Sequence, residues 1–493
     1  MSASAESPAV SGKRRLPLRE QRLRAITGYA GTAADLVAKG QENKLHNRSR
    51  SFTQCGTCSS FSATLILSLI RDAAVVNHAP AGCAGDFGLF NLYNRYGQTK
   101  RGLALSNAHL VSTNLSDNDA VFGAGEKLRD AIREAKRRFE ARAIFVTSSC
   151  VSGIVGEDLE TVVREATQEL GIPVLSVACE GVCSELWANG WDAAFDAILR
   201  GIVKPVRSSR ADLVNVINFI GEDYFADLLR PLGLVSNLVV PFATVEQLER
   251  LSESVATVQM CPTLGTHLGA GLEQQFGVPE IRHPPPYGLA ATDAWLRELA
   301  TITHRQTMVE QVIATERESI QDELASLRKL FNGARAFVAA GPAHGHGFMA
   351  VLRDLGMQVV GACGWHHDTV CDHGDPSGDT LNQFVRNHGD VPYGVCHKQP
   401  FELTNMLRRV APDVLVVRHP SLAICGAKLG IPTFFVDDEH LAIGYRGLIR
   451  YGNKIADWFK NPALERNLAK HTRLPYSNWW LSQPAHSFLS AET

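Results

Sequence analysis

Long apolar runs are scarce in this chain. The longest, near residues 61–70 and 238–245, are well short of the roughly 18–20 residues that span a bilayer. Residues 1–24 are polar and basic and lack the apolar core of a secretory signal. An excess of positive charge is also missing, since the net charge is −2. We therefore expect neither a membrane protein nor a nucleic-acid binder, but a cytoplasmic protein.

Two common site signatures are incomplete. Cys55 and Cys58 form a close pair, but the second close pair that a zinc site requires does not follow, because the next cysteine, Cys83, stands alone. The glycines at 123 and 125 precede a helical pattern, but no strand leads into them and no GK[ST] follows, so a nucleotide site is not expected. A disulfide framework is not expected in a long chain without a secretory signal.

The composition is that of an ordinary globular protein. The chain has 493 residues, of which 45% are hydrophobic and 20% charged, which allows ample core and about three domains. Eleven cysteines in a cytoplasmic protein indicate metal or redox chemistry, with some cysteines simply packed in the core.

The most informative stretch runs from Cys55 to Cys83 and is read together with Cys150. An apolar segment of helical length follows the close pair, glycines flank Cys83, and Cys150 ends an apolar run. Thiolates placed beside glycine and serine can approach a metal cluster, and iron–sulfur clusters are held mainly by thiolates. Spacing alone leaves a cluster site and a plain redox or zinc-type pair equally open.

From residue 143 onward, strand patterns alternate with helical patterns, which indicates parallel sheets with crossover helices. Strands are expected at 143–147, 174–177, 213–220, 235–240, 255–260, 336–340, 358–362, 414–418 and 433–436. Helices are expected at 33–41, 61–74, 126–139, 159–170, 191–201, 245–252, 271–276, 291–328 and 347–355, with a glycine- and aromatic-rich loop at 85–102. We predict an α/β protein with several Rossmann-like units: a tail and helix at 1–50, then domains at 51–210, 211–330 and 331–493.

Cysteines and histidines follow these strands at their carboxyl ends, where open α/β sheets bind ligands. They are Cys150, Cys179, Cys261, His344, His346, Cys363, His366, His367, His419 and His440. Core packing would scatter such residues along the strands, so the shared position favours a site. Two histidine pairs are expected to converge as proton donors or substrate-orienting groups: His344 with His346, and His366 with His367.

Taken singly, several of these residues have a simpler explanation. Free cysteines often pack as small apolar side chains, which is the preferred interpretation of Cys179, Cys363, Cys371, Cys396 and Cys425. Ordinary loop positions are the preferred interpretation of His388, His397 and His419.

A family resemblance rests on the order of several motifs. The chain contains, in sequence, HAPAGC, STNLSDNDAVFG, TSSCVSGIVGEDL, VACEGV, Cys261, DLGMQVVG and GIP followed by EH and GYRG. Over residues 50–460 this order resembles nitrogenase component 1 and its relatives. The resemblance implies three Rossmann-like domains around a buried metallocluster.

The resemblance also implies metal ligands. Cys58, Cys83 and Cys150 match the cysteines that this family's α subunit gives to an [8Fe-7S] cluster shared with a β subunit, which leaves Cys55 as a spare. Cys261 matches the ligand at one end of a large iron–sulfur–carbide catalytic cluster, whose heterometal and organic acid ligand stay open. The family places a histidine at the other end; simple counting reaches Asp437, and we favour His440, three residues later.

Departures from the dinitrogen-reducing pattern point to another substrate. Trp187 and Trp191 stand where those members carry Gln and His, Asn91 replaces an Arg, and the Arg-bearing glycine loop becomes GPAHGHG. Aromatic walls favour apolar or sulfur-bearing small molecules. The pattern most resembles the catalytic subunit of methylthio-alkane reductases, which cleave C–S bonds of small methylthio compounds, such as methylthioethanol or dimethyl sulfide, to methanethiol and a hydrocarbon, ethylene included.

This resemblance implies partners: a homologous β subunit in an α₂β₂ heterotetramer and an ATP-dependent [4Fe-4S] reductase homodimer. Alternatives remain open at this point. They are a nitrogenase α subunit, a cofactor-assembly scaffold, a tetrapyrrole reductase of the same superfamily, and an unrelated metal-free α/β binding protein.

Overall fold

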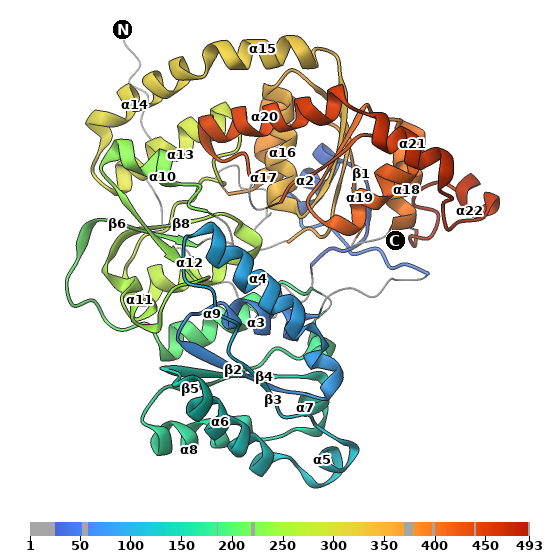
Figure 1. Cartoon of the computed structure of the whole chain (residues 1–493). Coiled ribbons are helices and arrows are strands. Elements are labelled where there is room, and N and C mark those ends of the chain that lie inside the picture. Colours follow the sequence, from blue (N-terminus) through green and yellow to red (C-terminus); the bar gives the residue numbers. More distant parts are fainter. Residues whose placement is uncertain are drawn as a thin grey trace.

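Three separate parallel sheets organise the chain in the computed structural model, which describes residues 25–51, 58–184, 186–217, 222–368, 378–396, 400–437 and 440–491. The first sheet has the order β3-β2-β4-β5, with β2 (Ala73–His78), β3 (Leu110–Ser112), β4 (Ala143–Ser148) and β5 (Val174–Val177). All its pairings are parallel. Every residue of β2 and β4 is buried, because helices cover both faces of this sheet (Figure 1).

The second sheet is smaller and the third larger. The second has the order β7-β6-β8, with β6 (Arg210–Ile217), β7 (Val235–Val239) and β8 (Ser254–Gln259). The third has the order β1-β11-β10-β9-β12-β13, with β1 (Tyr29–Thr32), β9 (Arg335–Ala340), β10 (Gln358–Gly364), β11 (Pro392–Val395), β12 (Val414–Val417) and β13 (Thr433–Phe435). Only β1 runs antiparallel, so the predicted N-terminal tail contributes an edge strand to the last sheet. The predicted α/β class with parallel sheets is confirmed.

A layer of buried helices lies between the sheets and positions the candidate residues. Here α3 (Ser59–Ser68) packs on α9 (Asn189–Gly201), α9 on α12 (Pro262–Phe276), and α12 on α16 (Pro342–Asp354). The last two begin with a proline, whose fixed φ suits the first helical position. Cys58 stands at the start of α3 and Cys261 at the start of α12, and Figure 1 shows these two helices between the sheets.

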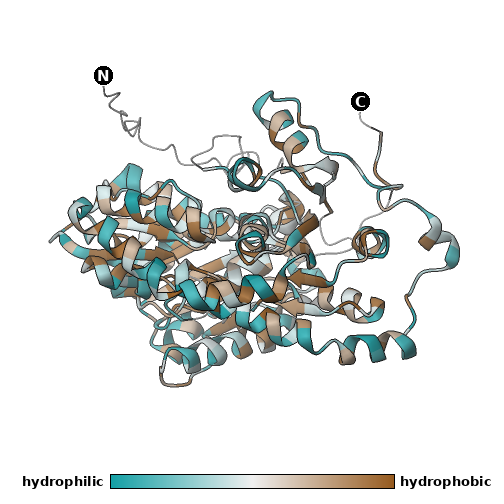
Figure 2. Ribbon diagram, turned by 90° about the horizontal axis from the view of Figure 1, so that it is seen from above, coloured by the Kyte–Doolittle hydropathy of each residue, from teal (hydrophilic) through white to brown (hydrophobic). Residues whose placement is uncertain are grey.

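The outer helices form because their apolar residues recur at helical spacing. In α6 (Gly125–Phe139), Leu128, Ala131, Ile132 and Ala135 are buried, and charged residues cover the other face. Seen from above, such helices carry hydrophilic and hydrophobic stripes (Figure 2). The other helices are α2 (Ala33–Gln41), α4 (Phe87–Lys100), α5 (Asp117–Phe122), α7 (Cys150–Val155), α8 (Leu159–Leu170), α10 (Ala226–Leu229), α11 (Val245–Glu249), α13 (Leu289–Ile302), α14 (Gln306–Ser319), α15 (Gln321–Phe331), α17 (Thr380–His388), α18 (Pro400–Val410), α19 (Pro420–Leu429), α20 (Gly444–Lys460), α21 (Ala463–His471) and α22 (Asn478–Ser482), with short 3₁₀ turns η1 (Ala81–Asp86), η2 (Gly181–Cys183), η3 (Arg230–Leu232) and η4 (Leu251–Glu253).

Two predictions of local structure were wrong. Residues 85–102 form no loop but contain α4, because Phe90, Asn94, Gly97 and Gln98 recur at helical spacing and are buried together. The helix predicted at 61–74 ends at Ser68, and its last residues begin β2.

The long helix predicted at 291–328 is three helices, α13, α14 and α15, and it breaks near residues 303–305 and again at 320. Among the described residues, the structure contains no helix that is both long and apolar enough to cross a bilayer.

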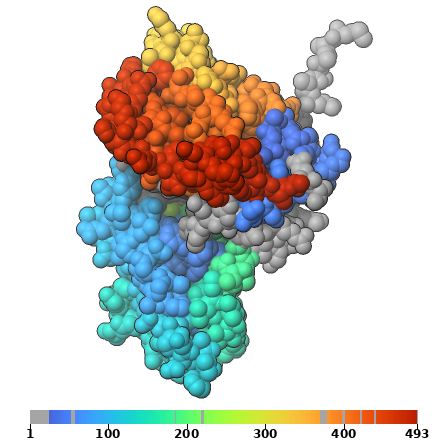
Figure 3. Space-filling model, turned by 90° about the vertical axis from the view of Figure 1, so that its right-hand side faces the viewer, coloured from blue at the N-terminus to red at the C-terminus, as the bar shows by residue number. Residues whose placement is uncertain are grey.

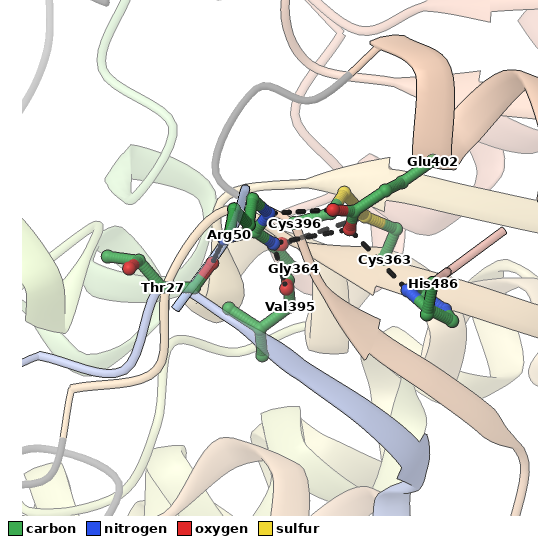
Figure 4. Close-up of a disulfide and its surroundings, with 8 residues drawn as sticks. All are labelled: Thr27, Arg50, Cys363, Gly364, Val395, Cys396, Glu402 and His486. Atoms are coloured by element: carbon green, nitrogen blue, oxygen red, sulfur yellow. Dashed lines mark hydrogen bonds and ion pairs between the residues drawn. A yellow bond between two sulfur atoms is a disulfide. The ribbon is translucent and has the colours of Figure 1, made fainter. Parts of the chain in front are cut away.

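A disulfide joins Cys363 and Cys396 at the ends of neighbouring strands β10 and β11, where only small buried side chains were predicted (Figure 4). Beside it, Arg50 forms a buried ion pair with Glu402, at 2.6 Å between Nε and Oε1, and donates to the Val395 carbonyl. His486 lies 3.5 Å from the other Glu402 oxygen. This clamp (Arg50, Glu402 and His486) fastens both terminal segments to the third sheet.

Candidate metal and substrate sites

Cys58 and Cys150 come together at Gly181. Cys58 caps α3, where its Sγ accepts from the Phe61 amide, and Cys150 is the first residue of α7. A Cβ placed on Gly181 would lie 2.9 Å from Cys58 Cβ and 3.4 Å from Cys150 Sγ. Only glycine leaves room for both sulfurs at this point.

Cys83 completes this group from η1, just before α4. Burial, and then the nearby thiols of Cys58 and Cys150, raise the pKa of the Cys83 thiol. The structure therefore brings together the three predicted cluster cysteines, which we call the thiol triad. Cys55 lies outside the described residues. Across the part of the chain that the structure describes, no three Cys, His, Asp or Glu side chains are placed to hold a single metal ion.

The thiol triad opens onto an apolar surface. Cys58 and Cys83 are exposed. Large apolar side chains around them are exposed as well, namely Leu92 on α4, Val121 and Phe122 on α5, Ile154 on α7 and Val182 beside Gly181. The α5 helix packs on α7, which begins at Cys150, and Val182 neighbours Gly181. We call these exposed side chains the apolar rim, because exposed apolar surface marks interaction sites.

Cys261 belongs to a different place, a cavity of about 700 Å³ between the sheets. It follows β8 and precedes α12, and its side chain is only 6% exposed. Apolar residues of α3 and of α4, including Leu89, Tyr93 and Tyr96, line much of the wall. Figure 3 shows the light-blue α4 segment at the surface between the blue-to-green and orange-to-red parts of the molecule.

The cavity wall contributed by the third sheet is polar. Arg418 and His419 follow β12, and Asp437 follows β13, so neighbouring strand ends deliver all three. Arg418 donates to the Val436 carbonyl at 3.0 Å, which holds its guanidinium across the two strand ends. His440 does not line the cavity; its Nδ1 lies 2.5 Å from Asp437 Oδ1, behind the carboxylate.

Both predicted tryptophans line the cavity, and the predicted asparagine does not. Trp187 is half-buried and Trp191 is 7% exposed, and Trp191 packs edge-on against Phe195. Asn91 instead accepts a hydrogen bond from the Ala108 amide at 2.9 Å. Because residues 87–100 form the helix α4, Leu89, Leu92 and Tyr93 line the part of the cavity where Asn91 was predicted.

Of the four predicted histidines, only His344 lines this cavity. His346 lies two residues further along α16 than His344. Residues two positions apart in an α-helix point in roughly opposite directions. His346 is held by Thr380 at 2.6 Å and Tyr393 at 2.8 Å, and burial lowers its pKa to about 3. His366 and His367 are 2% exposed, and the His367 backbone pairs with Ile26. The expected convergence of the two pairs on one site is therefore not what the structure shows.

His344 hydrogen-bonds through Nδ1 to the Tyr287 hydroxyl at 2.7 Å. Burial, and then the positive charge of Arg418, lower its pKa well below the usual value of a histidine. His344 is therefore a neutral imidazole in a wall that also carries a guanidinium.

Sequence reasoning missed Arg418, Tyr287 and the α4 wall, and underrated His419. Arg418 was taken as the last residue of the strand predicted at 414–418 and was therefore left out of the strand-end residues, whereas His419 was included among them but interpreted as an ordinary loop position. Tyr287 follows a proline-rich turn and carries no periodic signal.

Comparison with known proteins places this geometry in context. Residues 58–460 match the family described as nitrogenase component 1 type oxidoreductase. The chain is 25% identical over 457 residues to the nitrogenase iron-molybdenum cofactor biosynthesis protein NifE of Methanococcus maripaludis, covering 88% of this chain and 90% of that protein. It is 25% identical over 437 residues to the nitrogenase molybdenum-iron protein alpha chain of that species, covering 84% and 88%. The solved structure of nitrogenase Cp1 at pH 6.5 superposes with a TM-score of 0.68 at 20% identity, covering 88% of this chain and 94% of that chain.

Proposed function

The chain belongs to the nitrogenase component 1 type oxidoreductase family, as its motifs predicted, and from that premise we propose that it is the catalytic subunit of a C–S bond reductase. Its substrates are small methylthio compounds such as methylthioethanol or dimethyl sulfide. The reaction consumes two electrons and two protons and breaks one C–S bond. Dimethyl sulfide yields methanethiol and methane, whereas methylthioethanol yields methanethiol and ethylene, with its C–O bond also broken and one water released.

The observation that carries this proposal is the lining of the large cavity. A single buried thiol, Cys261, stands in a cavity whose α3, α4 and tryptophan side is apolar and aromatic, opposite the polar ends of the third sheet. Thioethers are apolar and polarizable, and they pack well against aromatic rings. Dinitrogen-reducing members of the family carry Gln, His and Arg at the corresponding positions. In this chain, side chains that suit an S-methyl group take their place.

The donors present fit the metal groups that the family implies. The thiol triad supplies three soft sulfur ligands around a position that any Cβ would fill, which suits an [8Fe-7S] cluster shared with a second subunit. In the cavity, Cys261 would hold one end of a large iron–sulfur–carbide cluster, and the Asp437–His440 pair would supply the other attachment. When bound, this cluster would supply low-potential electrons for C–S cleavage.

The chain's own residues account for the remaining steps. Trp187, Trp191 and the α4 wall exclude water and hold the methylthio group. Arg418 places a positive charge beside the polar end of the cavity, where thiolate character develops as the bond breaks. His344, one of two histidines that line the cavity together with His419, can deliver a proton to the departing groups.

The partners follow from the surface around the thiol triad. Its exposed sulfurs and apolar rim suit burial by a homologous β subunit, giving an α₂β₂ heterotetramer. Electrons would come from an ATP-dependent [4Fe-4S] reductase homodimer.

A second candidate function is cofactor assembly, which the similarity to NifE favours. An assembly scaffold would carry a precursor in the same cavity and release it to an acceptor protein without turnover. A nitrogenase α subunit would instead produce ammonia from dinitrogen.

One experiment separates these functions. The complex is purified anaerobically, its iron, molybdenum and vanadium are measured, and it is supplied with the reductase, ATP and either methylthioethanol or dinitrogen. Methanethiol without ammonia supports the proposal. Ammonia identifies a nitrogenase, and transfer of iron to an acceptor protein without either product identifies a scaffold.

A further inference from the structure

Tyr287 and His344 form a buried pair at the wall of the large cavity. Both side chains are buried, at 3% and 5% exposure, and their rings meet edge-to-face with centroids 5.9 Å apart. Tyr287 Oη lies 2.7 Å from His344 Nδ1, a normal distance for a strong hydrogen bond. The hydroxyl therefore holds His344 at Nδ1.

The Tyr287 ring is held in place from two sides. A Cβ on Gly347 would lie 2.4 Å from the ring, so glycine at this point of α16 lets the ring lie against the helix. The Tyr287 amide donates to the Pro285 carbonyl at 2.7 Å, and the residue forms a β-bridge with Ile443. The hydroxyl therefore has one position relative to His344.

The hydrogen bond is compatible with Nδ1 of His344 as acceptor or as donor, and only the acceptor arrangement leaves a hydrogen on Nε2. A neutral imidazole carries one hydrogen, and when Nδ1 accepts from a tyrosine hydroxyl, that hydrogen is on Nε2. Burial and the Arg418 charge keep His344 neutral. A neutral ring releases the Nε2 proton easily only if Nδ1 gains one in the same event.

A second, small cavity lies beside Tyr287 and could hold water. Its volume is about 30 Å³, enough for a water molecule. Asp354 and His388 line it together with Tyr287, and half-buried His388 connects it to the protein surface.

We propose that Tyr287 is a positioning and proton-relaying residue, which fixes His344 with Nε2–H toward the large cavity and refills it with protons from solvent. This inference rests on the proposed reductase function. In the step, the Nε2–H bond breaks as its proton goes to the substrate, and Nδ1 takes the proton of the Tyr287 hydroxyl. The Tyr287 oxygen takes a proton from water in the small cavity, and the hydroxide left there takes a proton from solvent. His344 is left as the Nδ1–H tautomer and regains its Nε2 proton by tautomer exchange before the next transfer, and no electrons move in the relay.

The test compares Tyr287→Phe with Tyr393→Phe in the full complex. Tyr393 gives a matched control, because it makes a 2.8 Å hydrogen bond to His346, a histidine outside the large cavity. We expect Tyr287→Phe to lower kcat by about 100-fold, at the lower end of what acid–base groups contribute, with KM and iron content unchanged. Tyr393→Phe should leave kcat within about twofold of the parent.

A readout independent of turnover uses the ¹⁵N-histidine-labelled full chain, with His344→Gln to assign the signal. Tyr287→Phe should change the ring nitrogen shifts of His344, and Tyr393→Phe should not. Unchanged His344 shifts, or an unchanged kcat in Tyr287→Phe, would overturn the relay. Absence of methanethiol from the parent complex would instead remove the proposed function, while the nitrogen shifts still report on the Tyr287–His344 pair.

Discussion

The two cysteine sites of this molecule are built in opposite ways. Two of the three thiols in the triad are exposed and an apolar rim lies near them, whereas Cys261 is 6% exposed in the wall of a large cavity that reaches the surface at α4. We infer that another protein completes the exposed site and that a small molecule fills the cavity beside the buried thiol. The difference assigns electron entry to the surface and bond cleavage to the interior, and the predictions below test that division.

The largest effect is expected from Cys261→Ala. Loss of the one buried thiol in the cavity should reduce methanethiol formation below detection and remove the iron held there, because soft thiolate ligation is lost. Iron at the thiol triad should remain. Metal analysis and product assays check both points.

The matched control is Cys425→Ala, since Cys425 is a free, buried cysteine outside both sites. It should keep all iron and activity. Loss of iron from the thiol triad in Cys261→Ala would show that the two sites are not separate.

The converse change is Gly181→Ala. The new Cβ would lie 2.9 Å from Cys58 Cβ and must displace the sulfurs, because the space is close-packed. We expect loss of iron at the thiol triad and of electron transfer into the protein, with iron in the cavity kept. Gly82→Ala is the control, because nothing lies within 4 Å of its Cβ. Equal iron contents in the two variants would contradict the geometry of the triad.

A smaller effect is expected at the apolar rim. Phe122 is 85% exposed, and Phe122→Asp should weaken association with the β subunit by about 10- to 100-fold, as loss of a buried aromatic anchor does. Analytical ultracentrifugation measures the dissociation. Met308→Asp on α14, which is 45% exposed and away from the rim, should leave association unchanged. If both substitutions weaken association equally, the rim is not the interface.

The last prediction concerns the stability of the fold and neither cysteine site. Burial alone would raise the pKa of Glu402, but hydrogen bonds from His486 and Arg50 hold it below the usual value. A lowered folded-state pKa contributes stability that is present above the unfolded pKa and lost as pH falls through the folded pKa. Glu402→Gln should therefore cost about 3 kcal/mol near pH 7, because Arg50 is left buried without its partner, and should flatten the acid side of the stability profile.

Chemical denaturation at several pH values measures this effect, with iron content unchanged in the variant. Glu169→Gln breaks an exposed pair with Arg133 and should cost less than about 1 kcal/mol. A similar cost for both substitutions would mean that burial does not strengthen the clamp.

The parallel sheets and the positions of the cysteines were predicted from the sequence more accurately than the positions of the histidines. Parallel strands and cysteines at their ends follow from local patterns, so Cys58, Cys83 and Cys150 were expected together and the structure places them together. The direction in which a side chain leaves a helix depends on its exact start, and α16 begins at Pro342, which sends His344 and His346 to opposite sides.

Contacts between segments that are distant in the sequence could not be predicted from the sequence either. The Tyr287–His344 bond and the Cys363–Cys396 disulfide depend on tertiary packing that no single segment encodes. The same holds for α4, whose glycines suggested a loop while its buried face, seen only in the fold, makes it a helix.

The central claim is that the cavity at Cys261 cleaves C–S bonds. The most direct measurement is methanethiol produced from methylthioethanol by the purified complex with its reductase and ATP, for the parent protein and for Cys261→Ala. The account predicts methanethiol from the parent and none from the variant, at equal amounts of folded complex. Equal methanethiol from both, or ammonia from dinitrogen in place of methanethiol, would contradict it.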